Sequence, residues 1–505
     1  MTSISIAAAA STTFIVLEYL VKIVAVGVVP ENRRPSSSTA WLLAILFVPV
    51  VGIPLFLLLG SPYINRRRAR IQARANEILA KGTEAVPSEP ESLSISRELG
   101  GIVELSRSLT ALPMVTGTNY GVLSDYRESI DRMTALVHQA QESVCVEIYI
   151  MARDTTTEAF FQALEDAVRR GVTVRLLLDH MGSRKYPGFR DFLRGMTEAG
   201  IDWHLMLPFL PLRGKARRID LRNHRKLLIV DGKTAVMGSQ NLIESTYGSA
   251  KNLEIGRHWH DISIQLSGEI VSSLEAIFAV DWYSETDEII DIHAYRLEGE
   301  EIVEASDVLP NVHGPTPDVG GPVNGVQLIP SGPGFRTDPN LRAFTSLMYM
   351  ARERLAIVSP YFVPDESLLA GVITAAHRGV RVELYVSEVA DQFMVDRAQS
   401  SYYQALLDAG VHIMLYPAPA VLHTKCFIVD DTCAVLGSSN MDMRSFGLNY
   451  EISLLSYGGD IVGQVREIID DYARVSTQLD PHHWARRGVV RRYTESVMRL
   501  TSALQ

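Results

Sequence analysis

Two long apolar segments dominate the first sixty residues of the chain. Residues 40–60 form a run of 21 without a charged side chain, and a helix of that length spans about 30 Å, the thickness of a bilayer's hydrocarbon core. Residues 4–29 are apolar except for Glu18 and Lys22, which lie one helical turn apart and can pair. The alternatives are a buried core helix for the later segment, and a re-entrant segment or a signal peptide for the earlier one, although no basic region precedes it. The pattern predicts a membrane anchor over residues 1–60 that forms a transmembrane hairpin.

The charges beside these segments indicate their orientation. Five arginines and no acid lie within residues 61–75, whereas residues 30–39, between the segments, carry a net charge of +1. Because the cytoplasmic flanks of membrane helices are enriched in Lys and Arg, the larger positive flank predicts that the rest of the chain faces the cytoplasm. We therefore expect a multi-pass protein of the cytoplasmic membrane, with its N-terminus on the same side as its catalytic part.

The chain after residue 115 repeats one order of elements. A β-branched run at 144–150 is followed by a helical stretch that ends at Gly171 and by a second strand, and the same order recurs from 355–359 through a helical stretch that ends at Gly379. Alternating strands and helices predict an α/β fold with two related halves, each a mixed β-sheet flanked by helices. The expected boundaries are 61–115 for a juxtamembrane connector, 116–286 for the first half, 287–322 for an acidic linker rich in Pro and Gly, 323–480 for the second half and 481–505 for a basic C-terminal tail.

Composition narrows the class of protein further. The chain has 505 residues, of which 47% are hydrophobic and 21% charged, and this excludes a disordered protein. Its three cysteines, Cys145, Cys426 and Cys433, are too few for a disulfide framework and are expected to be buried thiols. The net charge of −10 argues against nucleic acid as a partner, because nucleic-acid-binding domains are usually strongly basic.

One pattern with six fixed residues over 18 positions, H-x-K-x₄-D-x₆-G-S-x-N, occurs once in each half. Residues two apart on a strand share a face, so the histidine and lysine of each copy are expected to point towards one ligand. A single H-x-K at a strand end is most often only solvated, but two copies with the same internal spacing make coincidence implausible. The copies comprise His224, Lys226, Asp231, Gly238, Ser239 and Asn241 in the first half, and His423, Lys425, Asp430, Gly437, Ser438 and Asn440 in the second.

These residue types suit the displacement of an oxygen at a phosphodiester. The lysines Lys226 and Lys425 supply positive charge, and the asparagines Asn241 and Asn440 with the serines Ser239 and Ser438 supply neutral donors to the phosphate oxygens. One imidazole can attack phosphorus and the other can protonate the leaving oxygen, since the unperturbed histidine pKa of ~6.5 lies near neutrality. A metal site is the alternative for the histidines, but each has a lysine two residues away, which opposes a cation. The pattern predicts neither a metal nor a cofactor.

These paired motifs resemble those of the phospholipase D superfamily, and the match extends to the bacterial cardiolipin synthases. The first copy lies in LRNHRK and is followed by HWHD, which ends at Asp261, and by FAVDW at Phe278–Trp282. The second half opens with SPYFVPD at Ser359–Asp365 and closes with NMDMRSFGLNYE at Asn440–Glu451. The resemblance covers nearly the whole chain. One departure is GSQN in the first half, where many synthases resemble G-G-x-N, but the asparagine is kept.

The resemblance implies both an activity and a role for each site residue. It implies two phospholipase D-like halves related by a pseudo-twofold axis around one site at their interface. It further implies a membrane-bound transferase that makes cardiolipin and glycerol from two phosphatidylglycerol molecules through a phosphatidyl-histidine. In that reaction His224 is the nucleophile and His423 the acid and base. Asp261 and Glu451 match carboxylates that orient the histidines, whereas the family's counterparts of Asp231 and Asp430 are mainly structural.

Two other functions remain compatible with the motifs. A phospholipase D-type hydrolase that uses water or another alcohol as acceptor passes through the same intermediate, so the motif alone does not distinguish it from a transferase. A non-catalytic membrane scaffold with a degenerate site is the other, although both copies of the motif are intact. In every case the expected partners are phospholipid substrates and the bilayer, and the sequence indicates no oligomeric state.

Overall fold

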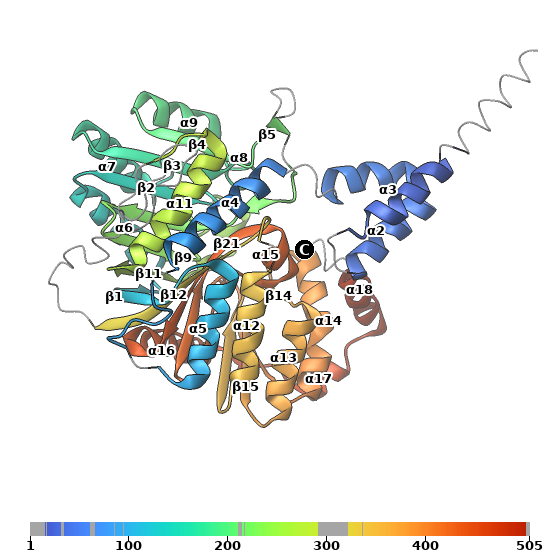
Figure 1. Ribbon diagram of the computed structural model, residues 1–505. Helices are drawn as coiled ribbons and strands as arrows, with labels where there is room; N and C mark the ends of the chain where they lie inside the picture. Colours follow the sequence, from blue (N-terminus) through green and yellow to red (C-terminus); the bar gives the residue numbers. More distant parts are fainter. Residues whose placement is uncertain are drawn as a thin grey trace, which may run out of the picture. The chain divides into compact units, whose positions relative to one another are not determined.

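The computed structural model describes most of the chain, which divides into two compact units (Figure 1). One unit comprises Met1–Arg66 with Phe209–Asp220, and the other comprises Arg67–Pro208 with Leu221–Gln505. The two units are treated separately below. The described residues are 16, 18–31, 35–60, 66–84, 86–93, 95–210, 215–216, 218–290, 322–335 and 337–500.

The N-terminal unit differs from the predicted hairpin of two continuous spans. The expectation of one helix over 40–60 is wrong, because the run is divided at Val48 (φ −133°, ψ 63°). Proline restricts the residue before it and lacks an amide hydrogen, so Pro49 ends one helix and starts the next. The resulting elements are α2 (Pro35–Phe47), α3 (Pro49–Leu55) and a π-helical turn, η1 (Phe56–Gly60). Within the described ranges, no helix is both long and apolar enough to cross a membrane.

The earlier apolar segment is described only in its second part. Residues 4–15 and 17 of the predicted segment lie outside the described residues, and residues 18–28 are helical. Lys22 Nζ lies 2.6 Å from Glu18 Oε1, so the predicted pair one turn apart is confirmed. The same unit contains the short antiparallel pair β5 (Phe209–Leu210) and β6 (Lys215–Ala216).

One sheet runs through both halves of the larger unit. Within the described residues it has 16 strands, one of which, β7 (Arg222–Asn223), lies off the main path and pairs with β21. Apart from the additional edge strand β22, the order of the others reads alike from both ends towards the antiparallel pair β1–β12 at the middle. In each half three neighbouring strands are parallel to one another and the other strands pair antiparallel, so the predicted mixed α/β fold is confirmed. From the first end the strands are β4 (Asp202–Met206), β3 (Thr173–Asp179), β2 (Ser143–Ile148), β8 (Lys226–Val230), β9 (Thr234–Gly238), β11 (Ser263–Ser267) and β1 (Val115–Leu123). From the other end they are β22 (Thr477–Gln478), β16 (His412–Tyr416), β15 (Arg381–Ser387), β13 (Arg354–Val358), β18 (Cys426–Val429), β19 (Cys433–Gly437), β21 (Asn449–Tyr457) and β12 (Val323–Ser331).

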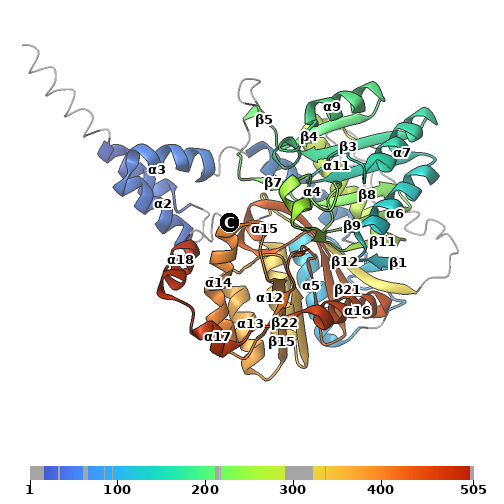
Figure 2. The same cartoon turned by 180° about the vertical axis from the view of Figure 1, so that it is seen from behind.

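Helices cover both faces of this sheet because its strands are apolar on both sides. On β8, Leu227 and Ile229 join one core while Leu228 and Val230 join another, as the alternation of side chains along a strand requires. The first core includes residues of α11 (Ile270–Thr286) and α16 (Gly459–Val475) from the two halves. The other faces are covered by α6 (Tyr126–Gln139), α7 (Glu158–Arg169) and α9 (Phe189–Glu198) in the first half, and by α12 (Pro339–Met350), α13 (Glu366–His377) and α14 (Phe393–Asp408) in the second. Figure 2 shows the same layers from behind.

Segments outside the two repeats also belong to the larger unit. The predicted connector contains α4 (Arg66–Gly82) and α5 (Arg97–Thr110), which contribute Leu79 and Val103 to the cores. Of the predicted linker, residues 291–321 lie outside the described residues.

The remaining short elements of the larger unit are α8 (His180–Arg184), α10 (Ala250–Glu254), α15 (Met443–Gly447), α17 (Pro481–Ala485), α18 (Val489–Arg499), β7 (Arg222–Asn223), β10 (Trp259–His260), β14 (Phe362–Val363), β17 (Val421–Leu422) and β20 (Met441–Asp442).

Candidate active site

Each histidine follows a short strand that pairs with the opposite half. In front of His224, β7 runs parallel to the start of β21, and the His224 amide donates to the Tyr450 carbonyl at 2.8 Å. In front of His423, β17 runs parallel to β10, and the His423 amide donates to the His260 carbonyl at 2.7 Å. Backbone pairing across the two halves therefore fixes the position of both imidazoles.

Each half supplies the carboxylate for the histidine of the other half. His224 Nδ1 lies 3.0 Å from Glu451 Oε2 in the second half. His423 Nδ1 lies 2.6 Å from Asp261 Oδ1 in the first half. A carboxylate at Nδ1 favours a proton on that nitrogen and leaves Nε2 with the lone pair that a nucleophile or base needs. The exchange makes one site from two halves.

The serines of the two motifs hold these carboxylates. The hydroxyl of Ser239 donates to Asp261 Oδ1 at 2.6 Å, and the hydroxyl of Ser438 donates to Glu451 Oε2 at 2.5 Å. Each hydroxyl also accepts the backbone N–H of the residue after its carboxylate, and both serines are fully buried. The sequence predicted phosphate binding by these serines, whereas their hydrogen bonds in the structure go to the carboxylates that orient the histidines.

Both motif lysines are buried beside the histidines. The ammonium groups of Lys226 and Lys425 donate to the carbonyls of His224 and His423, respectively. Burial lowers the pKa of Lys425 to about 8 and lowers that of Lys226 well below its usual value. Little water therefore competes for these donors, so they are suited to the charge of a phosphodiester.

The two motif asparagines have different surroundings. Asn241 donates through Nδ2 to the Tyr247 hydroxyl at 2.8 Å and accepts the Ile150 amide at 3.2 Å. The amide oxygen of Asn440 is buried and has no hydrogen-bond partner in the described part of the chain. Tyr149 also contacts the cluster, with its ring 4.9 Å from the His224 ring at an interplanar angle of 65°. Neither tyrosine belongs to a recognisable motif, and Tyr149 lies in the strand-like run at 144–150, so sequence reasoning missed both.

The aspartates of the two motifs lie away from the histidines, at the far ends of β8 and β18. Asp231 accepts the backbone amides of residues 141–143, and Asp430 accepts those of residues 352–354. Both aspartates have a positive φ, of 53° and 52°. They fix the start of the neighbouring strand rather than contact the reacting groups, as the resemblance implied.

Burial sets the protonation state of the histidine–carboxylate pairs. It lowers the pKa of His224 to about 4 against the opposing effect of Glu451, and it lowers the pKa of His423 against Asp261. Burial alone would raise the carboxylate pKa values, but the histidines and lysines lower the pKa of both Asp261 and Glu451. At neutral pH the site therefore holds ionised carboxylates and neutral imidazoles with available lone pairs. Among the described residues, no group of three His, Cys, Asp or Glu side chains could hold a metal ion.

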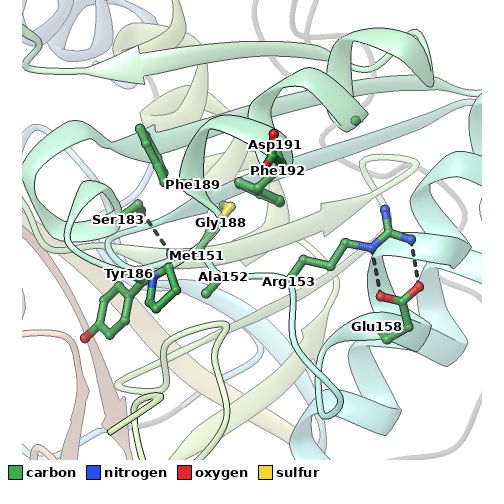
Figure 3. Close-up of a pocket in the computed structure, with 12 residues that line it drawn as sticks. Met151, Ala152, Arg153, Glu158, Ser183, Tyr186, Gly188, Phe189, Asp191 and Phe192 are labelled. Carbon is green, nitrogen blue, oxygen red and sulfur yellow. Dashed lines mark hydrogen bonds and ion pairs between the residues drawn. The ribbon is translucent and has the colours of Figure 1, made fainter.

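A cavity of about 390 Å³ lies in the first half, and none of the motif residues lines it (Figure 3). Ser183, in its wall, accepts the Met151 amide at 3.0 Å and donates to the carbonyl of Tyr149 at 3.3 Å. Tyr149 packs against His224, so Ser183 links the cavity wall to the backbone of a residue that contacts the imidazole. Arg153, at another part of the wall, is paired with Glu158 at 2.8 Å. The remaining wall includes Ala152, Tyr186, Phe189 and Phe192.

Comparison with known proteins identifies the family. A family profile described as "Cardiolipin synthase, PLD-like domain" matches residues 133–282 and 344–472, which include both histidine motifs. The chain belongs to the cardiolipin synthase family of the phospholipase D superfamily. A second profile, described as "Phospholipase_D-nuclease N-terminal", matches residues 20–61. The resemblance stated from the motifs is therefore confirmed.

Individual relatives extend this match over nearly the whole chain. The cardiolipin synthase of Geobacillus kaustophilus (strain HTA426) is 32% identical over 478 residues, which cover 94% of this chain and 90% of the relative. Cardiolipin synthase A of Yersinia pseudotuberculosis serotype IB is 30% identical over 493 residues, which cover 94% of each chain. Among solved structures, the phosphatidylserine synthase of Haemophilus influenzae Rd KW20 has a TM-score of 0.57 at 15% identity, covering 81% of this chain and all of that one. At that identity the likeness concerns the fold alone.

Proposed function

We propose that this protein is a membrane-bound phosphatidyltransferase that joins two phosphatidylglycerol molecules into cardiolipin and releases glycerol. The observation that carries the proposal is the exchange of carboxylates between the two histidines, with a buried lysine beside each. Two imidazoles held in this way supply both a nucleophile and an acid within one site, as transfer through a covalent intermediate requires. Membership of the cardiolipin synthase family supports the choice of substrate.

In the first step His224 Nε2 attacks phosphorus and the bond to the glycerol oxygen breaks. His423 donates a proton to that oxygen, and free glycerol leaves a phosphatidyl group on His224. We assign the acid to His423 because its carboxylate contact is the shorter, 2.6 Å against 3.0 Å, and so stabilises an imidazolium better. The bound phosphodiester adds a negative charge beside the two histidines, which favours the protonated form of His423.

In the second step the hydroxyl of another phosphatidylglycerol attacks the phosphatidyl-histidine. His423 removes the proton from that hydroxyl, the new P–O bond forms, and the P–N bond to His224 breaks. Cardiolipin leaves, and both histidines return to their starting state. Lys226, Lys425, Asn241 and Asn440 stabilise the charge on the phosphate oxygens through both steps.

Residues 1–60 are proposed to hold the catalytic part at the bilayer from the cytoplasmic side. The apolar side chains of this segment support the proposal, since Ile23, Phe47 and Val50 are between 68% and 79% exposed. Two membrane-inserted segments separated by residues 30–39 would leave both ends of the anchor in the cytoplasm. The remaining boundaries are proposed as the sequence predicted them, with two catalytic halves over 116–286 and 323–480.

Incubation of the purified protein with labelled phosphatidylglycerol in mixed micelles tests this function. The proposal predicts cardiolipin and glycerol in equal amounts. Phosphatidic acid and glycerol without cardiolipin would show that water is the acceptor and would contradict the proposal. A double variant, His224→Ala with His423→Ala, is the control for contaminating activity.

A further inference from the structure

Arg68, in the helix that follows the N-terminal apolar segments, is buried in the larger unit. Its side chain in α4 is only 4% exposed, and Nη2 lies 2.5 Å from Asp281 Oδ1 in α11. Its Nη1 pairs with Glu285, and its guanidinium lies 4.3 Å from the centre of the Tyr450 ring. The sequence treated every arginine of residues 61–75 as a charge at the membrane surface, whereas this one is part of a buried cluster.

The same cluster reaches the backbone on both sides of the first histidine–carboxylate pair. Asp281 also pairs with Arg225, which lies between the catalytic His224 and Lys226. Arg225 Nε donates to the carbonyl of Glu451 at 3.2 Å, and its guanidinium lies 5.7 Å from the Tyr450 ring. Tyr450 in turn accepts the backbone amide of His224. Two arginines thus share one aspartate and contact the residue that joins His224 to Glu451.

We propose that Arg68 is a positioning residue for His224. Without its guanidinium, Asp281 and Glu285 lose a buried cationic partner and the Tyr450 ring loses the group packed on it. The β7–β21 pairing, which places His224 beside Glu451, is then no longer held in one position. Arg68 also lies shortly after the proposed anchor over residues 1–60. Its contacts in this cluster therefore tie the start of α4 to the first half of the site. The part of this inference that concerns catalysis rests on the proposed function.

Arg68→Met is expected to lower kcat on the order of 10–100-fold, the effect of a misplaced reacting group, and to leave KM almost unchanged. Arg67→Met is the matched control, because Arg67 is the neighbouring residue of α4 and pairs with the exposed Asp287. Both variants remove one positive charge from the same stretch. Equal losses of activity in both would show that the stretch acts through its charge at the membrane and would overturn the proposal.

Hydrogen exchange tests the positioning without any assay of activity. Arg68→Met should speed exchange in the β7–β21 pair around residues 222–224 and 449–451, and should leave the β10–β17 pair around 259–260 and 421–423 unchanged. The exchange rates of the β7–β21 pair in Arg68→Lys should lie between those of Arg68→Met and of the parent protein, since lysine keeps the charge but lacks the planar guanidinium. Unchanged exchange at 449–451, or an equal rise in both pairs, would overturn the proposal. If the parent protein makes no cardiolipin, the proposed function fails while the exchange result still decides the role of Arg68.

A second inference comes from α18, whose apolar residues face outwards. Val489, Val490, Tyr493 and Leu500 are between 70% and 84% exposed, although their spacing places them along one side of the helix. On the opposite side the buried residue is a charged one, Glu495. There Glu495 pairs with Arg487 and Arg491 at 2.9 and 3.0 Å, and both guanidiniums lie 4.8 Å from the Trp484 ring. Large apolar side chains of α18 thus lie on its exposed side.

We infer that this outer face of α18 docks on an anionic phospholipid surface. Arg486 and Arg492 beside the apolar residues are exposed and have no carboxylate partner in the described ranges. Apolar side chains flanked by cations match a leaflet of negative headgroups, which attracts each base. The choice of phosphatidylglycerol as the lipid rests on the proposed function. The docking itself requires only the negative charge of the surface.

A fluorescent label at position 493 tests this docking in the full chain. The three native cysteines are buried, so Tyr493→Cys provides one reactive thiol for an environment-sensitive dye. We expect a blue shift of its emission in phosphatidylglycerol bilayers, a smaller one in phosphatidylcholine, and none at the control site Val475→Cys, which is 52% exposed on α16. No shift at position 493 in either lipid would overturn the inference. A shift that grows with protein concentration without lipid would instead show contact between copies and would also overturn it.

Discussion

Between its histidine and lysine the first half of the site has Arg225, and the second half has Thr424. Arg225 is fully buried and pairs with Asp281 of α11. Thr424 hydrogen-bonds through its hydroxyl to that of Tyr472 in α16 at 2.9 Å. Corresponding helices of the two halves, α11 and α16, thus contact the residue after each histidine. The contact with α11 is ionic and the contact with α16 is a neutral hydrogen bond.

The same contrast appears in the residue directly before each histidine. The amide of Asn223 donates to the buried carboxylate of Asp179, whereas the amide of Leu422 donates to the hydroxyl of Ser387. The reacting side chains are identical in the two halves, so the groups around them differentiate the two histidines. His, Lys, Ser and Asn recur at the same spacing in both halves, whereas the residues beside the histidines differ.

The largest expected effect is the loss of either histidine. His224→Ala should abolish turnover of phosphatidylglycerol, because no other group offers a nucleophile at that position. His423→Ala should also be nearly inactive on the natural lipid, but should still release a nitrophenol leaving group, which needs no proton, in one stoichiometric burst. Stopped-flow absorbance measures this burst. A burst from His224→Ala and none from His423→Ala would reverse the two roles.

Loss of a histidine-orienting carboxylate should follow in size. Glu451→Gln and Asp261→Asn should each lower kcat by roughly 10²–10⁴-fold, the range of acid–base assistance, because the neutral amide no longer favours the required form of the imidazole. The nitrophenyl substrate should rescue Asp261→Asn and not Glu451→Gln. Steady-state kinetics with the two substrates makes the comparison. Equal rescue of both variants would show that the two histidine–carboxylate pairs do not differ in function.

The pH profile should reflect the lysines on its alkaline side and His224 on its acid side. The pKa of Lys425 is lowered to about 8, so its charge is present below that pH and is lost as the pH rises through it. The pKa of His224 is lowered to about 4, so its imidazole stays neutral until the pH falls to that value. His423 must be protonated to act as the acid, and burial lowers its pKa from the usual value. We therefore expect kcat/KM to fall as the pH rises above the lowered pKa of His423, and to fall more steeply above about pH 8, where Lys425 also loses its charge. A profile that rises steadily through pH 9 would contradict this assignment.

The serines should give the smallest effect. Ser438→Ala removes a hydrogen bond to Glu451, and Ser239→Ala removes the equivalent bond to Asp261. Each should lower kcat by about tenfold, since a hydrogen bond to a charged group contributes about 1.5 kcal/mol, and should leave KM for phosphatidylglycerol within twofold. Initial rates over a range of lipid fractions in micelles separate the two constants. A large rise in KM with an unchanged kcat would restore the phosphate-binding role that the sequence predicted.

Local patterns predicted the mixed α/β fold and the resemblance supplied the family, but several contacts depend on the tertiary structure. Spacing within one half says nothing of which carboxylate reaches which histidine, because that follows from the pairing of β7 with β21 and of β10 with β17. A serine next to a phosphate-binding asparagine has the right chemistry for phosphate, and only the structure reveals its carboxylate partner. A count of charges does not reveal that Arg68 is buried. A count of apolar residues does not reveal that Pro49 interrupts the helix at Val48.

The proposed mechanism requires that a histidine of the first half carries the phosphatidyl group. Mixing the protein with ³²P-phosphatidylglycerol, quenching in alkali and mapping the labelled peptide tests it most directly. Alkali is required because a phosphoramidate is hydrolysed in acid. The mechanism predicts ³²P on the peptide that contains His224. This label should be lost when unlabelled phosphatidylglycerol is added before the quench, and it should be recovered as cardiolipin. Label on the peptide with His423, or turnover with no labelled peptide at any time, would contradict it.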